Sequence, residues 1–319
     1  MVVPPLFCYA GEVKIVTAGQ TYLDIDSYAG CIAYAELLQE QGFRAQAVSS
    51  ASFNQSIPQE VRGWNAPLVT VYTPCDDDTF SLVDISDPKA FANFVDLERV
   101  ETVIDHHPGF EAYWRERLGD HAYIERVGAA CTQVYERWVR AGLLDKMSEV
   151  SARLLVCGIL DNTLNFGASI TNQRDKIAYA ELFNRANLPD DWPARYFAAC
   201  EASIMADPAA ALKDDTKRIT YKTFSEEIRA GQLAVWDGAA LLKSRKATIE
   251  AAMTGIEPHW FVNVISIGEG KSYFVCDSPA VQVWLGDLLG VTFSEGQAVA
   301  DRMWLRKEIR KEDLDTPEL

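Results

Sequence analysis

The stretch that decides the fold is VETVIDHHPGF, residues 100–110. A β-branched run, typical of a buried strand, ends here in one carboxylate and two adjacent imidazoles, Asp105, His106 and His107. The whole chain holds four histidines, and two of them stand side by side at this point. Carboxylate and imidazole are common ligands of divalent metal ions. The stretch therefore predicts a strand that ends in a metal site.

Similar strand-like runs alternate with helical periodicity through the first part of the chain. We expect strands over 12–19, 44–50, 67–73, 80–86 and 100–106, and helices over 27–42, 130–144, 148–160 and 173–187. This alternation predicts an α/β fold, a mainly parallel sheet flanked by helices. Ligands of such sheets gather at the carboxyl ends of the strands, which is where residues 105–107 would lie.

The pattern changes after a polar stretch at 205–217. Strands are expected over 231–238, 259–268 and 271–278, with the last two joined as a hairpin through Glu269 and Gly270. Helices are expected over 243–253 and 281–290. These elements predict a smaller α+β domain at the C-terminus. We therefore expect two domains, one over 1–204, which carries the DHH triplet, and one over 205–319.

Composition and charge argue against some classes of binding partner. A formal net charge of −16 argues against binding long nucleic acids through a basic surface. No apolar run is long enough for a transmembrane helix, so we expect no membrane partner. The N-terminal stretch MVVPPLFCYAGEVK lacks basic residues before its short apolar patch, which predicts no signal peptide and residence in the cytoplasm.

Aspartates end three further apolar runs. They are Asp24 and Asp26 in LDID, Asp84 in LVDIS and Asp161 in ILDN. Each has an ordinary structural explanation, since Asp26 could be a helix N-cap, Asp84 a turn residue and Asp161 the end of a helix. Together with the DHH triplet they form a ligand set for Mn²⁺ or Mg²⁺. Carboxylates that converge without cations would repel one another.

Four ordered motifs resemble the DHH phosphoesterase superfamily: TAGQTYLDIDS (17–27), LVDISDP (82–88), VIDHHP (103–108) and LLVCGILDNTLNF (154–166). The helical stretch RVGAACTQVYERW (126–138) is similar to the helix that follows the DHH strand in that superfamily. Within it, the chain looks most like the branch of family II (manganese-dependent) inorganic pyrophosphatases and exopolyphosphatases. It has no GGGH-like segment, which the phosphodiesterase branch carries.

The resemblance implies a role for each motif residue. Asp24 would bind one metal ion, Asp26 the second, and Asp84 would bridge both. His106 and Asp161 would complete the ligands of the second ion. His107 would face the substrate phosphate, and Asp105 would orient a histidine. In the C-terminal domain, DDTKRIT (214–220) and MWLRKEIRK (303–311) resemble anion-binding segments, which assigns substrate binding to Lys217, Arg306 and Lys307.

Two positions depart from the family pattern. Gln20 stands where the pyrophosphatases have a metal-binding histidine, four residues before the first aspartate, and Ile85-Ser86 follows Asp84 where histidine or asparagine is usual. A neutral amide is a weaker ligand for a transition metal than imidazole. We therefore expect Gln20 to hold the first ion weakly, or to favour Mg²⁺ there, and we expect polyphosphate-type substrates.

The leading hypothesis is a phosphohydrolase that uses two Mn²⁺ or Mg²⁺ ions to activate water against pyrophosphate or short polyphosphate. Asp84, His107 and Asp105 would be its catalytic residues. One alternative is a phosphodiesterase on short oligonucleotides or cyclic dinucleotides, which could stack on Trp260 and Trp284 unless these pack in the core. Another is a non-catalytic relative that binds metal or phosphate. The sequence leaves the oligomeric state open, a homodimer included.

Overall fold

The computed structural model describes residues 11–254 and 259–315. The chain divides into two compact units, Met1–Trp192 and Pro193–Leu319. The domain boundary that we predicted after residue 204 lies inside helix α7 (Trp192–Ala206). Part of the N-terminal stretch that predicted no signal peptide, residues 1–10, lies outside the described residues. Among the described helices, none combines the length and the apolar character needed to cross a membrane.

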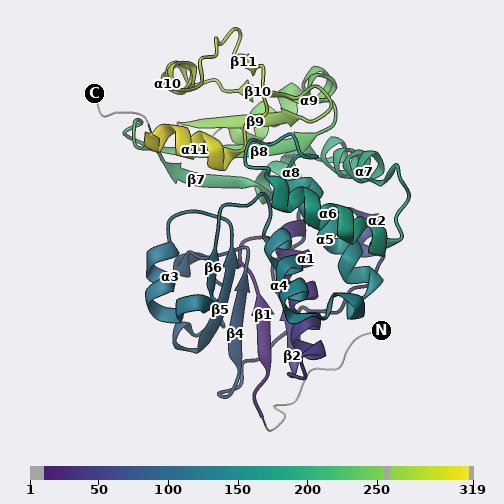
Figure 1. Ribbon diagram of the computed structural model, residues 1–319. Helices are drawn as coiled ribbons and strands as arrows, with labels where there is room; N and C mark the ends of the chain where they lie inside the picture. The colour runs from purple at the N-terminus through teal and green to yellow at the C-terminus, as the bar shows by residue number, and fades with distance from the viewer. Residues whose placement is uncertain (1–10, 255–258, 316–319) are drawn as a thin grey trace. The chain divides into compact units, whose positions relative to one another are not determined.

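The N-terminal unit is built on a parallel sheet of six strands, which confirms the predicted fold class (Figure 1). Its strands, in the spatial order β3-β2-β1-β4-β5-β6, are β1 (Lys14–Thr17), β2 (Ala45–Val48), β3 (Leu68–Val69), β4 (Thr79–Val83), β5 (Val100–Asp105) and β6 (Ala122–Ile124). Along the chain, β1, β2 and β3 follow one another toward one edge of the sheet, and β4, β5 and β6 follow one another toward the opposite edge. The topological switch point therefore lies between β1 and β4, where ligands of such sheets bind.

Helices surround this sheet. The longer ones are α1 (Ile25–Glu40), α3 (Glu111–Leu118), α4 (Ala130–Ala141), α5 (Glu149–Asn162) and α6 (Gln173–Ala186). A short helix α2 (Gln59–Arg62) and four 3₁₀ turns, η1 (Pro88–Ala90), η2 (Leu97–Arg99), η3 (Gly119–His121) and η4 (Leu144–Lys146), complete the unit. Helix α1 packs against α4 and α5 and is buried along most of its length.

The start of α1 corrects one sequence interpretation. We considered Asp26 as the N-cap of this helix, but the N-cap is Asp24, whose Oδ1 accepts a hydrogen bond from the Ser27 backbone N–H at 2.9 Å. Asp26 is thus a residue of the first helical turn, and its side chain is buried. Capping by Asp26 therefore does not explain why a carboxylate stands at that position.

The C-terminal unit holds a mixed sheet of five strands in the order β11-β10-β9-β8-β7. Its strands are β7 (Thr216–Thr220), β8 (Glu227–Val235), β9 (Trp260–Ser266), β10 (Lys271–Val275) and β11 (Gln297–Ala300). Its helices are α8 (Pro208–Asp214), α9 (Gly238–Met253), α10 (Pro279–Leu289) and α11 (Arg306–Asp315). Strands β9 and β10 pair antiparallel, which confirms the predicted hairpin, whereas β8 and β9 pair parallel.

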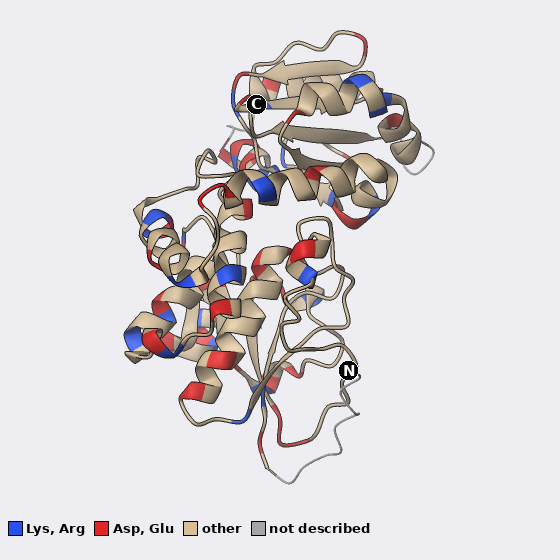
Figure 2. Cartoon of the chain, turned by 90° about the vertical axis from the view of Figure 1, so that its right-hand side faces the viewer, with Lys and Arg blue, Asp and Glu red and all other residues tan. Residues whose placement is uncertain are grey.

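Strand β9 is buried along its whole length because apolar residues cover both faces of the sheet. Trp260, Val262 and Val264 pack with residues of α8 and α9 in one cluster. Phe261, between them, packs with residues of α10 and α11 in another. In Figure 2, Asp and Glu residues alternate with Lys and Arg residues along helices of both units.

Candidate metal centre

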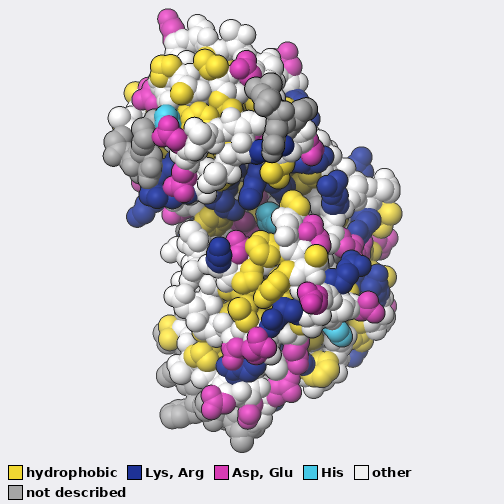
Figure 3. All heavy atoms as spheres, turned by 90° about the vertical axis from the view of Figure 1, so that its left-hand side faces the viewer, with side chains coloured by type: hydrophobic (Ala, Val, Ile, Leu, Met, Phe, Trp, Pro, Cys, Tyr) yellow, Lys and Arg dark blue, Asp and Glu magenta, His cyan; other side chains and the backbone are white. Residues whose placement is uncertain are grey.

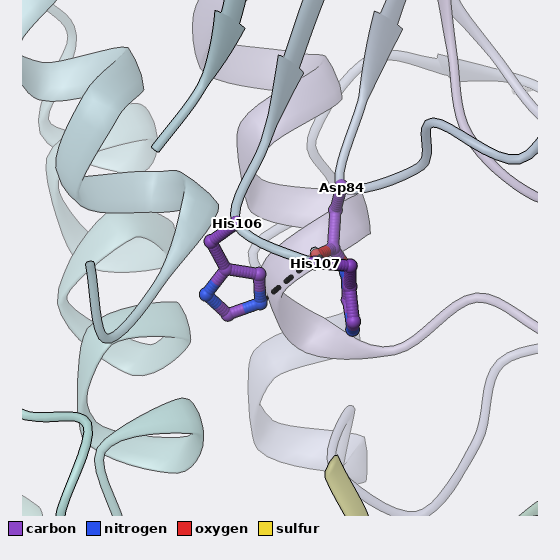
Figure 4. A group of neighbouring side chains, drawn as sticks. All are labelled: Asp84, His106 and His107. Atoms are coloured by element: carbon purple, nitrogen blue, oxygen red, sulfur yellow. Dashed lines mark ion pairs between the residues drawn. The ribbon is translucent and has the colours of Figure 1, made fainter. Parts of the chain in front are cut away.

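The candidate metal centre lies at the carboxyl ends of two adjacent parallel strands. Asp84 follows β4 directly, and His106 and His107 follow β5. Because β4 and β5 pair in parallel register, these three side chains meet at the same edge of the sheet. One ligand atom from each lies within 4.8 Å of the others, and Figure 4 shows the two imidazoles on either side of the Asp84 carboxylate.

Asp84 has an unusual backbone conformation, with a φ of 61° in the left-handed region. This conformation costs a residue with a side chain about 1–2 kcal/mol, although aspartate and asparagine tolerate it better than most. It is held in place because the Asp84 N–H donates to the Ile104 carbonyl at 2.8 Å. Its Oδ2 accepts a hydrogen bond from Ser27 Oγ at 2.8 Å. Strain at a strand end next to buried ionisable groups is typical of functional positions.

The hydrogen bond of His106 determines which of its nitrogens faces the carboxylates. Nδ1 lies 3.1 Å from the Val127 carbonyl, which can only accept, so Nδ1 carries the hydrogen. Nε2 of the neutral ring then presents its lone pair to Asp84 Oδ1, 3.3 Å away, and to Asp26 Oδ2, 3.8 Å away. Lone pairs this close repel one another in a buried site unless a proton or a metal ion lies between them.

His107 and Asp105 form a second pair at the same strand end. The Asp105 Oδ1 accepts from the His107 Nδ1 at 2.8 Å and from the backbone N–H groups of His106 and His107 at 2.7 and 3.1 Å. Asp105 is completely buried, whereas the His107 side chain is 40% exposed. With Nδ1 engaged, Nε2 is the nitrogen of His107 that remains available for a ligand. Asp105 thus fixes the orientation of His107.

Asp26 is held by helix α4. Its Oδ2 accepts from the Ala130 N–H and its Oδ1 from the Cys131 N–H, both at 2.8 Å. These amides begin α4, whose own N-cap residue, Ala129, has no side chain that could cap the helix. Neither this contact nor the hydrogen bond from Ser27 to Asp84 was predicted from the sequence. A helix start without a polar N-cap residue was the signal that could have indicated it.

The pKa values of the three buried carboxyls, Asp26, Asp84 and Asp105, shift in different directions. Burial, and next the negative charge of Asp84, raise the pKa of Asp26 well above its usual range. Burial opposes ionisation of Asp84 and Asp105 too. Protonated neighbouring histidines outweigh it: an imidazolium at His106 donates a hydrogen bond to Asp84, and the charge of His107 acts on both carboxyls. Their pKa values are therefore lowered. A cation beside Asp26 would stabilise its ionised form and so offset the effects of burial and of the Asp84 charge.

Among the described residues, the group whose ligand atoms lie within 4.8 Å of one another does not include the predicted ligands Asp24 and Asp161. Asp24, the N-cap of α1, is half-buried, and its charge contributes to the raised pKa of Asp26. Asp161, also half-buried, stands on α5 one turn after Gly158, at which a Cβ would lie 3.2 Å from Asp26 Oδ1. Gln20 is exposed in the loop after β1, and its backbone N–H donates to the Ala90 carbonyl at 3.1 Å.

The predicted phosphate ligands belong to the C-terminal unit. Lys217 is exposed on β7, opposite Ala230 of β8. Arg306 is buried at the start of α11, where its Nη1 donates to the carbonyls of Ala230 and Asp215 at 3.0 and 2.9 Å and its Nη2 to Asp215 Oδ1 at 2.5 Å. Lys307 follows it and is half-buried. The paired strands β7 and β8 and the start of α11 thus bring these three residues into one region of this unit.

The donor set fits a divalent cation of the Mn²⁺ or Mg²⁺ type. It joins the carboxylate of Asp84 to imidazole nitrogens, and Asp26 Oδ2 lies 3.8 Å from His106 Nε2. The hydrogen bond from His106 Nδ1 to a backbone carbonyl is the arrangement that metal-binding histidines commonly show, because it directs the lone pair of Nε2 to the ion. The buried Nε2 and Oδ1 that face each other are the atoms that a cation would satisfy.

Comparisons with known proteins agree with the motifs. A Listeria welshimeri protein named as a probable manganese-dependent inorganic pyrophosphatase is 24% identical over 306 residues, which cover 92% of this chain and 96% of that protein. A Listeria monocytogenes protein of the same name is 25% identical over the same shares. No protein-family model matches the chain.

The fold has a counterpart among solved structures. A Methanococcus jannaschii protein assigned to the family II inorganic pyrophosphatases superposes with a TM-score of 0.72 at 18% identity, covering 94% of this chain and 99% of that one. This likeness bears on the fold alone, while the sequence matches extend along nearly the whole chain. The chain is thus a relative of the DHH superfamily, as its four motifs predicted.

Proposed function

We propose that the protein is a metal-dependent phosphohydrolase that cleaves the phosphoanhydride bonds of pyrophosphate or short polyphosphate. The observation that carries the proposal is the arrangement of His106, whose Nε2 lies 3.3 Å from Asp84 Oδ1 while Nδ1 is engaged with the Val127 carbonyl. This arrangement favours a cation at the strand ends. The names of the curated relatives support a phosphoanhydride substrate and manganese as the metal.

Each residue contributes a defined part. Asp24, Asp26, Asp84, His106 and Asp161 would hold two ions, with Asp84 shared between them and Gln20 as the weakest donor. Divalent ions held there would activate water and neutralise the charge of the phosphates. His107, oriented through Asp105, would present Nε2 to a phosphate oxygen and hold a proton there. Lys217, Arg306 and Lys307 would bind the negative charge of the substrate or product.

Two competing functions are less well supported. The phosphodiesterase hypothesis needed exposed aromatic rings, but Trp260 and Trp284 are 2% and 8% exposed and pack in the core of the C-terminal unit. They therefore offer no surface on which bases could stack. A non-catalytic metal-binding relative would share the site described above, and it is distinguished by the absence of turnover.

A substitution at Asp84 tests the proposal. Asn is the better replacement because it tolerates the φ of 61° and removes only the charge. After chelation and return of Mn²⁺, we expect the unaltered protein to release phosphate from pyrophosphate or tripolyphosphate. We expect Asp84→Asn to lose roughly two orders of magnitude or more in rate, a typical cost of losing charge stabilisation at an active site.

Asp96→Asn is the matched control. Asp96 caps the 3₁₀ turn η2 that precedes β5, so it lies at the end of that strand opposite His106. This variant should retain the rate of the unaltered protein. Absence of phosphate release from both substrates with Mn²⁺ and with Mg²⁺ would rule out the proposed hydrolase, and a fully active Asp84→Asn would show that the reaction occurs elsewhere.

A further inference from the structure

A cavity in the N-terminal unit lies away from the metal centre. Its volume is about 700 Å³, and its lining includes Lys14 at the start of β1 and Thr102 near the start of β5. Tyr34 of α1 and Arg137 of α4 also line it. None of the proposed metal ligands belongs to the lining. Because the metal centre stands at the carboxyl ends of these strands, the cavity is a separate site at their opposite ends.

Arg137 contributes a buried positive charge to the lining of this cavity. The residue is only 7% exposed, and its guanidinium lies over the ring of Tyr123 at 3.9 Å. Within the described part of the chain, its Nε, Nη1 and Nη2 are buried and have no hydrogen-bond partner. A guanidinium carries five N–H donors, and burying it without an acceptor is unfavourable. The ring of Tyr123 interacts favourably with the flat face of the Arg137 guanidinium, but it offers no acceptor to the N–H groups at the edge of that guanidinium.

Two of the other cations of the lining, Lys14 and Arg117, have carboxylate partners. Lys14 pairs with Glu12 and Glu101, and Arg117 pairs with Glu98 at 2.7 Å. Glu101, the carboxylate of the lining, is engaged by Lys14, and among the described residues no ion pair joins a carboxylate of the lining to the buried Arg137. Figure 3 shows acidic, basic and apolar side chains mixed on one face of the chain, so no uniformly basic surface is seen there. The charge is confined, which favours a small anion over a nucleic-acid strand.

We propose that this cavity binds a phosphorylated organic molecule, with its phosphate on Arg137. The planar guanidinium matches phosphate geometry better than any other side chain. A volume of about 700 Å³ falls in the range of ligand sites, roughly 300–1,000 Å³, and far exceeds the space that a phosphate ion alone requires. Leu37, Leu38 and Phe43 supply apolar lining for the rest of the ligand.

Isothermal titration calorimetry with ADP, adenosine and inorganic phosphate tests this site. The measurement uses full-length Asp84→Asn protein in the presence of a chelator, so that the metal centre neither binds nor hydrolyses the probe. We expect ADP to bind, and adenosine and phosphate to bind at least roughly tenfold more weakly, since each lacks one part of the ligand. Failure of the proposed hydrolase would leave this experiment unaffected.

Arg137→Met assigns the binding to the cavity. Methionine fills similar space without charge, and we expect ADP affinity to fall by roughly tenfold or more. Arg115→Met, on the exposed side of α3 and outside the lining, is the control and should bind ADP normally. If Arg137→Met does not fold, Arg137→Lys replaces it and should weaken binding through loss of the planar fork. No heat with ADP, equal affinity for phosphate and ADP, or unchanged binding by a folded Arg137 variant would overturn the proposal.

Discussion

At the scale of single residues, the metal centre depends on which nitrogen of His106 carries the hydrogen. The Val127 carbonyl fixes it at Nδ1, so Nε2 meets the carboxylate of Asp84 with a lone pair. The adjacent His107 is fixed through Asp105 in the same tautomer but is partly exposed. The two neighbouring imidazoles therefore have different environments, one suited to a buried ion and the other to a ligand that enters from solvent.

Asp26 predicts how metal binding depends on pH. Burial and the charge of Asp84 raise its pKa in the metal-free protein, so a proton competes with the ion below that pKa. We expect the affinity for Mn²⁺ to rise with pH, by up to roughly tenfold per unit, until Asp26 is ionised without metal, and to level off above. Each binding event in the rising range should release a proton.

Calorimetric titration of Mn²⁺ in two buffers of different ionisation enthalpy measures this release. The observed heats should differ by the buffer's ionisation enthalpy multiplied by the protons released. Asp26→Asn should reduce the difference because it removes the titrating group. Equal heats in both buffers, at a pH where the affinity still rises, would contradict the role of Asp26.

The sequence was most informative about single residues whose types are rare in structural roles. The DHH triplet and Asp84 at the end of an apolar run pointed to the group of Asp84, His106 and His107 that the fold assembles. Ser27 could not be identified in the same way, because serine at a helix start has many ordinary explanations. The attachment of Asp26 to the start of α4 joins residues 104 positions apart, which no local pattern reveals.

At the scale of elements, the packing of α4 against α5 positions Asp26. Gly158 of α5 allows this close approach, since a Cβ there would overlap with Sγ of Cys131 and lie 3.2 Å from Asp26 Oδ1. In an isolated helix, alanine in place of glycine stabilises by about 1 kcal/mol. Overpacking of a buried contact costs about 1–3 kcal/mol, so the tertiary contact should outweigh the helix preference.

We therefore expect Gly158→Ala to lower the free energy of unfolding by about 1–2 kcal/mol and to weaken Mn²⁺ binding. Urea denaturation and metal titration measure the two effects. Adding Cys131→Ala to this variant removes the overlapping sulfur, and the double variant should recover part of both losses. Strictly additive effects of the two substitutions would show that the glycine is not required for this contact.

Strand and helix types followed from periodicity better than their lengths did. The parallel sheet and the β9–β10 hairpin were predicted from apolar runs and turn residues. The strand expected over 67–73 is limited to Leu68–Val69, because pairing with β2 at the sheet edge extends over only two residues. Strand β6 (Ala122–Ile124) was not predicted, since three half-buried residues give too short a pattern.

At the scale of the whole molecule, the proposed metal ligands and the proposed phosphate-binding residues lie in different parts of the sequence. All the proposed metal ligands belong to the first unit, and Lys217, Arg306 and Lys307 belong to the second. Arg306 has a structural role as well, through its buried ion pair with Asp215. Replacing Arg306 would disturb folding, because removing one partner of a buried ion pair lowers the free energy of unfolding by about 3–5 kcal/mol. Lys217 is the better test of phosphate binding.

We expect Lys217→Met to raise the KM for pyrophosphate by roughly tenfold, the effect of losing one charge-assisted hydrogen bond. Mn²⁺ binding should not change, because no proposed metal ligand is altered. Lys213→Met, an exposed lysine of the neighbouring helix α8, is the matched control and should leave KM unchanged. Steady-state phosphate release measures both variants. An unchanged KM for Lys217→Met would contradict its assignment to substrate binding.

The central claim is that divalent ions occupy the strand ends around Asp84 and His106. Anomalous diffraction at the manganese edge, from crystals grown with Mn²⁺, tests it most directly. We predict two manganese peaks about 3.5–4 Å apart, with the carboxylate of Asp84 between them and Nε2 of His106 bound to one. Gln20→His should raise the occupancy of the other peak. Manganese peaks elsewhere, or none, with Nε2 of His106 bonded directly to Asp84, would contradict the account.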